Sequence, residues 1–267
     1  MLDEKMISNI RDSGTAEGAA GAGPRARLLQ EMGFRTVPRA EYALIASCFL
    51  PSLVPAGMRA FRLLLDHLRV DYTLLEKEHC CGDILLRQGA RDKTGADMER
   101  ADAVAREFLE KNLAQARRAG AGKVIAFCVG CDLVYARFRD SVPEEILWYP
   151  TLLARLFPGG RLDLEADYFP GCHYHYRRLN RSLPDLDSAR ELLGRIEGLR
   201  VHDLDGRLCC TRPDQMATLL GDVRSRVVIT PCGGCAPALA QALSSRGEVR
   251  TVMLPEVLWA AVAGQTL

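Results

Sequence analysis

The chain has 267 residues, of which 48% are hydrophobic and 26% charged, so it can bury a globular core and is not a disordered protein. Its 35 basic and 34 acidic residues nearly balance, which argues against binding to nucleic acid or to a membrane surface through bulk charge. No apolar run reaches the roughly 18 residues of a transmembrane helix, and the N-terminal residues lack the apolar segment of a secretory signal. We therefore expect a cytoplasmic protein with no membrane span and no nucleic-acid partner.

The first 40 residues differ from the rest of the chain. They include the Gly/Ala-rich stretch GTAEGAAGAG, which lacks the GK[ST] sequence of a phosphate-binding P-loop. We expect residues 1–40 to be an N-terminal extension that is flexible or docks a partner.

Strand-like and helix-like segments then alternate twice in the same order. Buried strands are predicted by runs of apolar and β-branched residues at 41–47, 123–127, 166–171 and 226–231. Helices are predicted by apolar spacing at 57–70, 96–120, 187–201 and 213–223. Matching tails with a proline, ILWYPTLLARLF and VMLPEVLWAAV, close the two copies. The chain is therefore an internal duplication, which we divide into a first domain at 41–165 and a second at 166–267.

All ten cysteines lie within the duplication, and each copy reads C…CC…CxxC. The first copy holds Cys48, Cys80, Cys81, Cys128 and Cys131. The second copy holds Cys172, Cys209, Cys210, Cys232 and Cys235. Alternating strands and helices predict an α/β fold of two pseudo-symmetric Rossmann-like domains with mostly parallel sheets. Because the cysteine motifs follow predicted strands, we expect the thiols to gather at the strand C-terminal ends, where such sheets bind ligands.

Four kinds of cysteine chemistry could use this pattern. Disulfides are disfavoured without a secretory signal, and a dithiol redox site explains CxxC but not the three other cysteines of each copy. Structural zinc is the stronger alternative, although an adjacent Cys-Cys pair is a poor chelator for one tetrahedral ion. An iron–sulfur cluster takes thiolates from separated loops around several irons, so the pattern favours iron–sulfur binding over zinc.

The motifs EHCCGD, FCVGCD, FPGCHYH, RLCCTR and TPCGGC resemble the paired cysteine-rich CCG domains of the B-type subunit of heterodisulfide reductase. Related pairs occur in iron–sulfur subunits of lactate, glycolate and glycerol-3-phosphate oxidising systems. The resemblance implies two noncubane [4Fe–4S] clusters, one held by each group of five cysteines. Two departures are a threonine, Thr211, in place of the glycine of the second CCG, and gaps of 46 and 21 residues before the CxxC motifs.

The resemblance further implies an oxidoreductase subunit that reduces a small-molecule disulfide, with one electron from each cluster. His79, His173 and His175 flank cluster cysteines and are candidate proton donors, although a surface position or a hydrogen bond to a carbonyl or a cluster sulfur explains each of them more simply. Arg87, Arg177, Arg178 and Arg212 are candidate anchors for an anionic substrate, but with 30 arginines in the chain some would fall there by chance.

The resemblance also implies partner subunits. No nucleotide-binding fingerprint occurs in the chain, so a nucleotide cofactor would have to be bound by a partner. A ferredoxin-like iron–sulfur subunit would donate electrons to this chain, and a flavoprotein subunit would donate electrons to the ferredoxin-like subunit. Two alternatives remain open at this point: an electron-relay subunit without a substrate of its own, and a zinc-bound interaction scaffold.

Overall fold

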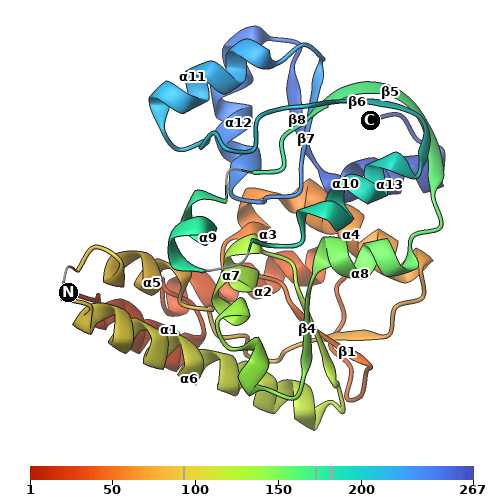
Figure 1. The fold of residues 1–267 in the computed structure, drawn as a ribbon. Coiled ribbons are helices and arrows are strands. Elements are labelled where there is room, and N and C mark those ends of the chain that lie inside the picture. The colour runs from red at the N-terminus through yellow and green to blue at the C-terminus, as the bar shows by residue number, and fades with distance from the viewer. Residues whose placement is uncertain (93, 172, 181–182) are drawn as a thin grey trace. The chain divides into compact units, whose positions relative to one another are not determined.

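The structure, a computed structural model, describes residues 1–92, 94–171, 173–180 and 183–267 (Figure 1). Cys172 therefore lies outside the described residues, as do the side chains of Tyr174 and His175. The described chain divides into two compact units. Unit 1 comprises Met1–Ser52, Val70–Tyr149 and His175–Pro184, and unit 2 comprises Leu53–Arg69, Pro150–Tyr174 and Asp185–Leu267.

The first copy of the repeat supplies a four-stranded sheet to unit 1. Its strands are β1 Tyr42–Ile45, β2 Tyr72–Leu74, β3 Lys123–Ala126 and β4 Glu145–Trp148. They are ordered β2-β1-β3-β4, and every pair is parallel. The accompanying helices are α3 Leu50–Leu53, α4 Pro55–His67, α5 Asp83–Gly89, α6 Ala96–Arg118, α7 Val129–Ala136 and α8 Tyr149–Leu156.

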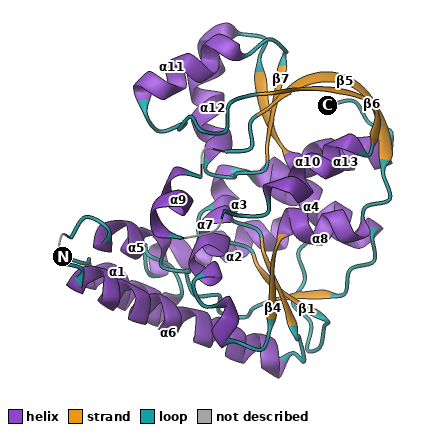
Figure 2. Ribbon diagram, in the orientation of Figure 1, coloured by secondary structure: helices purple, strands orange, loops and turns teal. Residues whose placement is uncertain are grey.

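The second copy builds a sheet of the same order in unit 2 (Figure 2). Its strands are β5 Gly160–Tyr168, β6 Ile196–Asp203, β7 Val227–Thr230 and β8 Arg250–Met253. The order β6-β5-β7-β8, again parallel throughout, repeats that of unit 1. The helices are α9 Tyr174–Leu179, α10 Leu186–Gly194, α11 Pro213–Asp222, α12 Cys235–Leu243 and α13 Leu254–Ala263. The expected α/β class with two Rossmann-like parallel sheets is confirmed.

One predicted helix is too long. The sequence pattern predicted a helix over residues 187–201, but α10 ends at Gly194 and β6 begins at Ile196. The C-cap of α10 is Arg195, and Gly198 has a φ of 85°, which a helix does not accommodate.

The compact units do not follow the copies of the repeat. The stretch Leu53–Arg69, with α4, comes from the first copy but packs in unit 2, and His175–Pro184 comes from the second copy but packs in unit 1. Helix α4 lies against α13, where a Cβ on Gly57 would be 2.6 Å from the Met253 side chain. Each unit is thus completed by a segment that follows the first cysteine of the other copy.

The N-terminal 40 residues contain two helices, α1 Glu4–Ser13 and α2 Ala19–Glu31, both in unit 1. Helix α1 lies beside α6 (Figure 1), with ion pairs from Arg11 to Glu107 and from Arg100 to Glu4. Ile7 and Ile10 are fully buried in the same core as α6. The sequence pattern indicated a flexible or docking extension and neither of these packed helices.

Candidate functional site: two groups of cysteines

Strand order explains how distant cysteines meet in unit 1. Strand β1 lies between β2 and β3, and a cysteine motif follows each of these three strands. Parallel strands end at a common edge, so the three motifs emerge side by side. The point between β1 and β3, where the strand order reverses, is also where open α/β sheets bind ligands.

The five cysteines of the first copy line one cavity of about 260 Å³. Cys80, Cys81 and Cys131 are buried, while Cys48 and Cys128 are half-buried. The other lining residues are Ser47, Phe49, Asp83, Ile84, Arg87 and Gly130. The first group therefore converges, as the sequence predicted, on a space walled largely by sulfur and apolar atoms.

The sulfurs form a line of pairwise contacts. Cys48 Sγ lies 3.4 Å from Cys80 Sγ. Further thiol hydrogen bonds join Cys80 to Cys81, Cys81 to Cys131, and Cys131 to Cys128. Within the described residues, no three His, Cys, Asp or Glu side chains meet closely enough to share one metal ion.

Two of these thiols have a lowered pKa. Hydrogen bonds from Cys48 and Cys81, with a further one from the Gly82 N–H, lower the pKa of Cys80 well below its usual value. A hydrogen bond from Cys131 and the backbone N–H groups of Cys131 and Gly130 lower the pKa of Cys128. Cys128 is also the N-cap of α7, where the helix dipole favours negative charge. Thiolates are the form of cysteine that binds metal.

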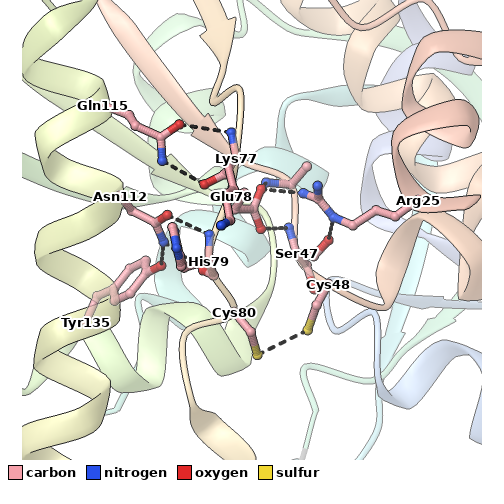
Figure 3. A network of polar contacts seen from close by, with 11 residues as sticks. Arg25, Ser47, Cys48, Lys77, Glu78, His79, Cys80, Asn112, Gln115 and Tyr135 are labelled. Atoms are coloured by element: carbon pink, nitrogen blue, oxygen red, sulfur yellow. Dashed lines mark hydrogen bonds and ion pairs between the residues drawn. The ribbon is translucent and has the colours of Figure 1, made fainter. Parts of the chain in front are cut away.

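The Cys80–Cys81 loop is held by helix α6. Asn112 accepts a hydrogen bond from the His79 N–H at 2.8 Å and donates one to the His79 carbonyl at 2.8 Å (Figure 3). One helical turn later, Gln115 binds the N–H and carbonyl of Lys77 in the same way. The two amides hold the backbone that leads into Cys80.

The glycine of the first CCG motif is required by its conformation. Gly82 has a φ of 83° and caps the start of α5, and an added Cβ would contact Ala105 at 3.4 Å. In the second copy this position is Thr211, and the described non-glycine residues with positive φ are Ser47, Arg69 and His173. The two Cys-Cys loops therefore differ in backbone conformation, and Thr211 instead places its Oγ1 3.1 Å from Cys209 Sγ.

One ion pair lies in the wall of the first cavity. Asp83 and Arg87, one turn apart on α5, approach to 2.6 Å. Burial raises the pKa of Asp83, although the Arg87 charge opposes that shift. Of the four arginines considered as anion anchors, Arg87 does line the cavity, but its charge is already paired with a carboxylate.

The second group of cysteines is buried in unit 2. Cys209, Cys210, Cys232 and Cys235 are between 2% and 7% exposed. Cys235 makes thiol hydrogen bonds to Cys210 and to Cys232, which raise its pKa well above the usual value. Cys232 precedes α12 and accepts the Cys235 N–H at 3.3 Å, much as Cys128 accepts the Gly130 N–H. Three of the five predicted ligands, Cys210, Cys232 and Cys235, are thus in contact, Cys209 is buried next to Cys210 in the chain, and Cys172 is outside the described residues.

The candidate proton donors do not gather at the first cavity. The His79 ring stacks on Phe108 of α6, with centroids 6.4 Å apart, and does not line the cavity. Burial, with Lys111 and Lys77 nearby, lowers the pKa of His79. In unit 2 the His173 ring lies 2.5 Å from the Pro170 carbonyl, and the His175 side chain is outside the description.

Three residues at the site escaped the sequence analysis: Glu78, Asn112 and Arg25. Glu78 carried a signal, because a glutamate two residues before a buried Cys-Cys pair must find a partner. Asn112 is a polar residue on the apolar face of the helix predicted at 96–120, and is 1% exposed. Arg25 lies in a Gly/Ala-rich stretch and gave no signal.

Comparisons with known proteins find similarity in the part of the chain that holds the first group of cysteines. The model of a family described as "CCG: Cysteine-rich domain" matches residues 42–134, which span the first group of cysteines. The D subunit of the dihydromethanophenazine:CoB–CoM heterodisulfide reductase of Methanosarcina mazei is 28% identical over 148 residues, covering 53% of this chain and 34% of that protein. The corresponding subunit of Methanosarcina acetivorans is 26% identical over 153 residues, again with 53% and 34% covered.

The match spans about a third of the length of these curated relatives. Among solved structures, an aspartate racemase homologue from Pyrococcus horikoshii OT3 is similar with a TM-score of 0.35 and 11% identity, covering 84% of this chain and 96% of that chain. That similarity is too low to indicate a shared fold or activity. Within the described residues, no helix combines the length and apolar character needed to cross a membrane. The chain contains a CCG cysteine-rich domain in its first copy and is a weak homologue of the D subunit of heterodisulfide reductase.

Proposed function

We propose that the chain is the iron–sulfur subunit of an oxidoreductase that cleaves a disulfide, with one noncubane [4Fe–4S] cluster in each group of five cysteines. The observation that carries the proposal is the set of five thiols on a single cavity in unit 1. A line of thiols around a cavity suits a cluster of several irons better than one zinc ion, which draws four ligands to a point. The CCG match and the two relatives, both heterodisulfide reductase subunits by name, support it.

The residues present fit a cluster in the first group. All five thiols are wholly or partly buried, two have a lowered pKa, and backbone N–H groups point at Cys80 and Cys128. Hydrogen bonds of this kind tune the potential of iron–sulfur clusters. In the second group the four described cysteines are placed compatibly, and we propose Cys172 as the fifth ligand there.

The chain's own residues would shape the reaction at the first cavity. When bound, the two clusters would each supply one electron to the substrate disulfide. Phe49 and Ile84, at 37% and 36% exposure, give the cavity an apolar rim that limits access of water. The Asp83–Arg87 ion pair is among the lining residues and could contact a substrate, whereas His79 faces α6 and does not line the cavity.

We further propose a separate electron donor, a ferredoxin-like subunit that receives electrons from a flavoprotein, as the names of the relatives as subunits suggest. One observation favours the alternative of an electron relay. The second group's described cysteines are at most 7% exposed, which suits a cluster that exchanges electrons without touching a substrate.

The deciding experiment measures iron, zinc and acid-labile sulfide per chain after purification without oxygen, with EPR spectra on the same sample. About eight irons with equal sulfide, and new signals on adding thiol or disulfide, would support disulfide reduction. About eight irons with only ordinary reduced-cluster signals would support the relay. Zinc without sulfide would refute both iron–sulfur functions.

A further inference from the structure

The residue before the first cysteine of each copy has an unusual backbone conformation. Ser47, before Cys48, has a φ of 80°, and Gly171, before Cys172, has a φ of 90°. Glycine adopts such angles freely, whereas a residue with a Cβ is strained in them. A similar positive φ is therefore adopted by a glycine in the second copy and by a serine in the first, so the serine needs contacts that hold it in this conformation.

A buried ion pair between Arg25 on helix α2 and Glu78 holds Ser47 in this conformation (Figure 3). Glu78 accepts hydrogen bonds from the N–H groups of Ala46 and Ser47, at 2.8 and 2.9 Å. Arg25 on α2 donates Nε to the Ser47 carbonyl at 2.8 Å and pairs through Nη2 with Glu78 at 2.5 Å. Both polar groups of Ser47's backbone are thus engaged, and the side chains of Arg25 and Glu78 are only 13% and 3% exposed.

The same pair ties two cysteine loops together. Glu78 is two residues before Cys80, and its carboxylate holds the backbone just before Cys48, so it fixes one loop against the other. The Cys48 and Cys80 sulfurs are the pair that lies 3.4 Å apart. An arginine can make both bonds at once because its guanidinium offers several donors in a rigid plane.

A second contact from the N-terminal segment reaches the same place. The Gly14 carbonyl, at the end of α1, accepts the Cys80 N–H at 2.7 Å. A Cβ on Gly14 would lie 2.3 Å from the Glu78 carbonyl oxygen, and Gly14 has a φ of 84°. The end of α1 therefore packs directly on the backbone that carries Glu78 and Cys80.

We propose that the N-terminal helices are a structural part of the first cluster site, and that Arg25, acting through Glu78 and Ser47, is the positioning residue for Cys48 and Cys80. This inference rests on the proposed cluster function. It assigns to residues 1–40 a role in assembling one of the two sites, because no comparable extension accompanies the second copy in sequence. The two sites would then differ in what their assembly requires.

The first test compares Arg25→Gln with Arg27→Gln, a neutral control two residues along the same helix, where Arg27 is exposed. We expect Arg25→Gln to hold about four irons per chain instead of about eight, with the EPR signal of one site lost, and Arg27→Gln to match the parent. The second site reports whether the variant is folded. Equal iron in the two variants, or loss of iron from both sites, would overturn the proposal.

The second test needs no cluster and so separates this inference from the proposed function. In metal-free, reduced full-length chain, we expect Cys48 in Arg25→Gln to react with iodoacetamide roughly tenfold faster, because its loop opens more often. Adding Ser47→Gly should restore a slow reaction and a filled site, since glycine makes the turn without help. If the parent chain bound no iron but the variants still showed these differences in alkylation rate, the cluster function would be refuted and the positioning role of Arg25 would stand.

Gly14→Ala gives an independent check against Gly23→Ala, whose added Cβ meets no atom within 4 Å. We expect Gly14→Ala to lose iron from the first site and to speed alkylation of Cys48, while Gly23→Ala leaves both unchanged. Failure of Ser47→Gly to rescue Arg25→Gln, or equal behaviour of the two glycine variants, would show that the N-terminal extension does not position these cysteines.

Discussion

Replacing Asn112 by alanine tests the view that α6 holds the Cys80–Cys81 loop through buried amides. Gln115 provides a matched control, because it makes the same pair of bonds to Lys77 that Asn112 makes to His79. The bonds differ in burial: Asn112 is 1% exposed, whereas the bonds of Gln115 to Lys77 are reached by solvent. Asn112 also donates to the Tyr135 hydroxyl at 3.2 Å, and Gln115 to the Lys111 carbonyl at 3.4 Å. The two variants therefore remove equal numbers of hydrogen bonds to the loop from different environments.

The expected loss of stability follows from the backbone groups that each substitution leaves without a side-chain partner. Asn112→Ala leaves the buried N–H and carbonyl of His79 without partners, at about 1–3 kcal/mol each, or about 2–6 kcal/mol together. Gln115→Ala exposes its two groups to water, which replaces the bonds, so the loss should stay below about 1 kcal/mol. At about 3 °C per kcal/mol for a unit of this size, the melting temperature falls by about 6–18 °C for Asn112→Ala and by at most about 3 °C for Gln115→Ala.

The two tryptophans give an assay for one unit at a time. Trp148 is buried in unit 1, whereas Trp259 lies in unit 2. In a Trp259→Phe background, the fluorescence of Trp148 follows the unfolding of unit 1. Every variant is heated at the same scan rate. Similar shifts for Asn112→Ala and Gln115→Ala would refute the argument from burial, and no shift for either would mean that α6 does not hold the loop.

Two further predictions concern the cysteine sites and the contact of α1 with α6. Cys80→Ser and Cys210→Ser should each lower the iron content by about half and remove the EPR signal of one site only, and unchanged iron in either would contradict the five-ligand assignment. A hydrogen bond from Arg11 lowers the pKa of Glu107 to about 2, so this group contributes stability above its ordinary value of 4.5 that is lost as the pH falls toward 2. In metal-free protein, the melting temperature of Arg11→Gln should therefore be lower than that of the parent, with the largest difference above about pH 5 and almost none near pH 2. A difference that did not change with pH would show that the Glu107 charge is not involved.

The sequence was most informative where local pattern and topology agree. The position of each cysteine motif after a strand predicted that the first group would meet at one sheet edge, and the shared strand order supports the duplication. Helix α6 was predicted almost to its ends because its apolar residues recur regularly and glycines follow it. These features depend on residues near one another in the chain.

What the sequence did not reveal depends on distant contacts. Helix α2 contains three Gly or Pro residues, Gly21, Gly23 and Pro24, and is held by burial of Leu29 and by the pairing of Arg25, which no local pattern reports. Helix α1 could have been recognised, since Asp3 caps its start and Gly14 its end around two buried isoleucines. The orientation of His79 toward α6 was beyond prediction, because it follows from which face of the loop Asn112 engages.

The exchange of segments between the two copies has a consequence for any attempt to divide the chain. Between residues 52 and 185 the backbone passes from one compact unit to the other five times, at 52/53, 69/70, 149/150, 174/175 and 184/185. A cut in the loop between Leu156 and Gly160 would leave each fragment holding a piece of the other's unit. The fragments would then complement each other when expressed together and aggregate when expressed apart. The duplicated halves are thus distinguishable in sequence but inseparable as folding units.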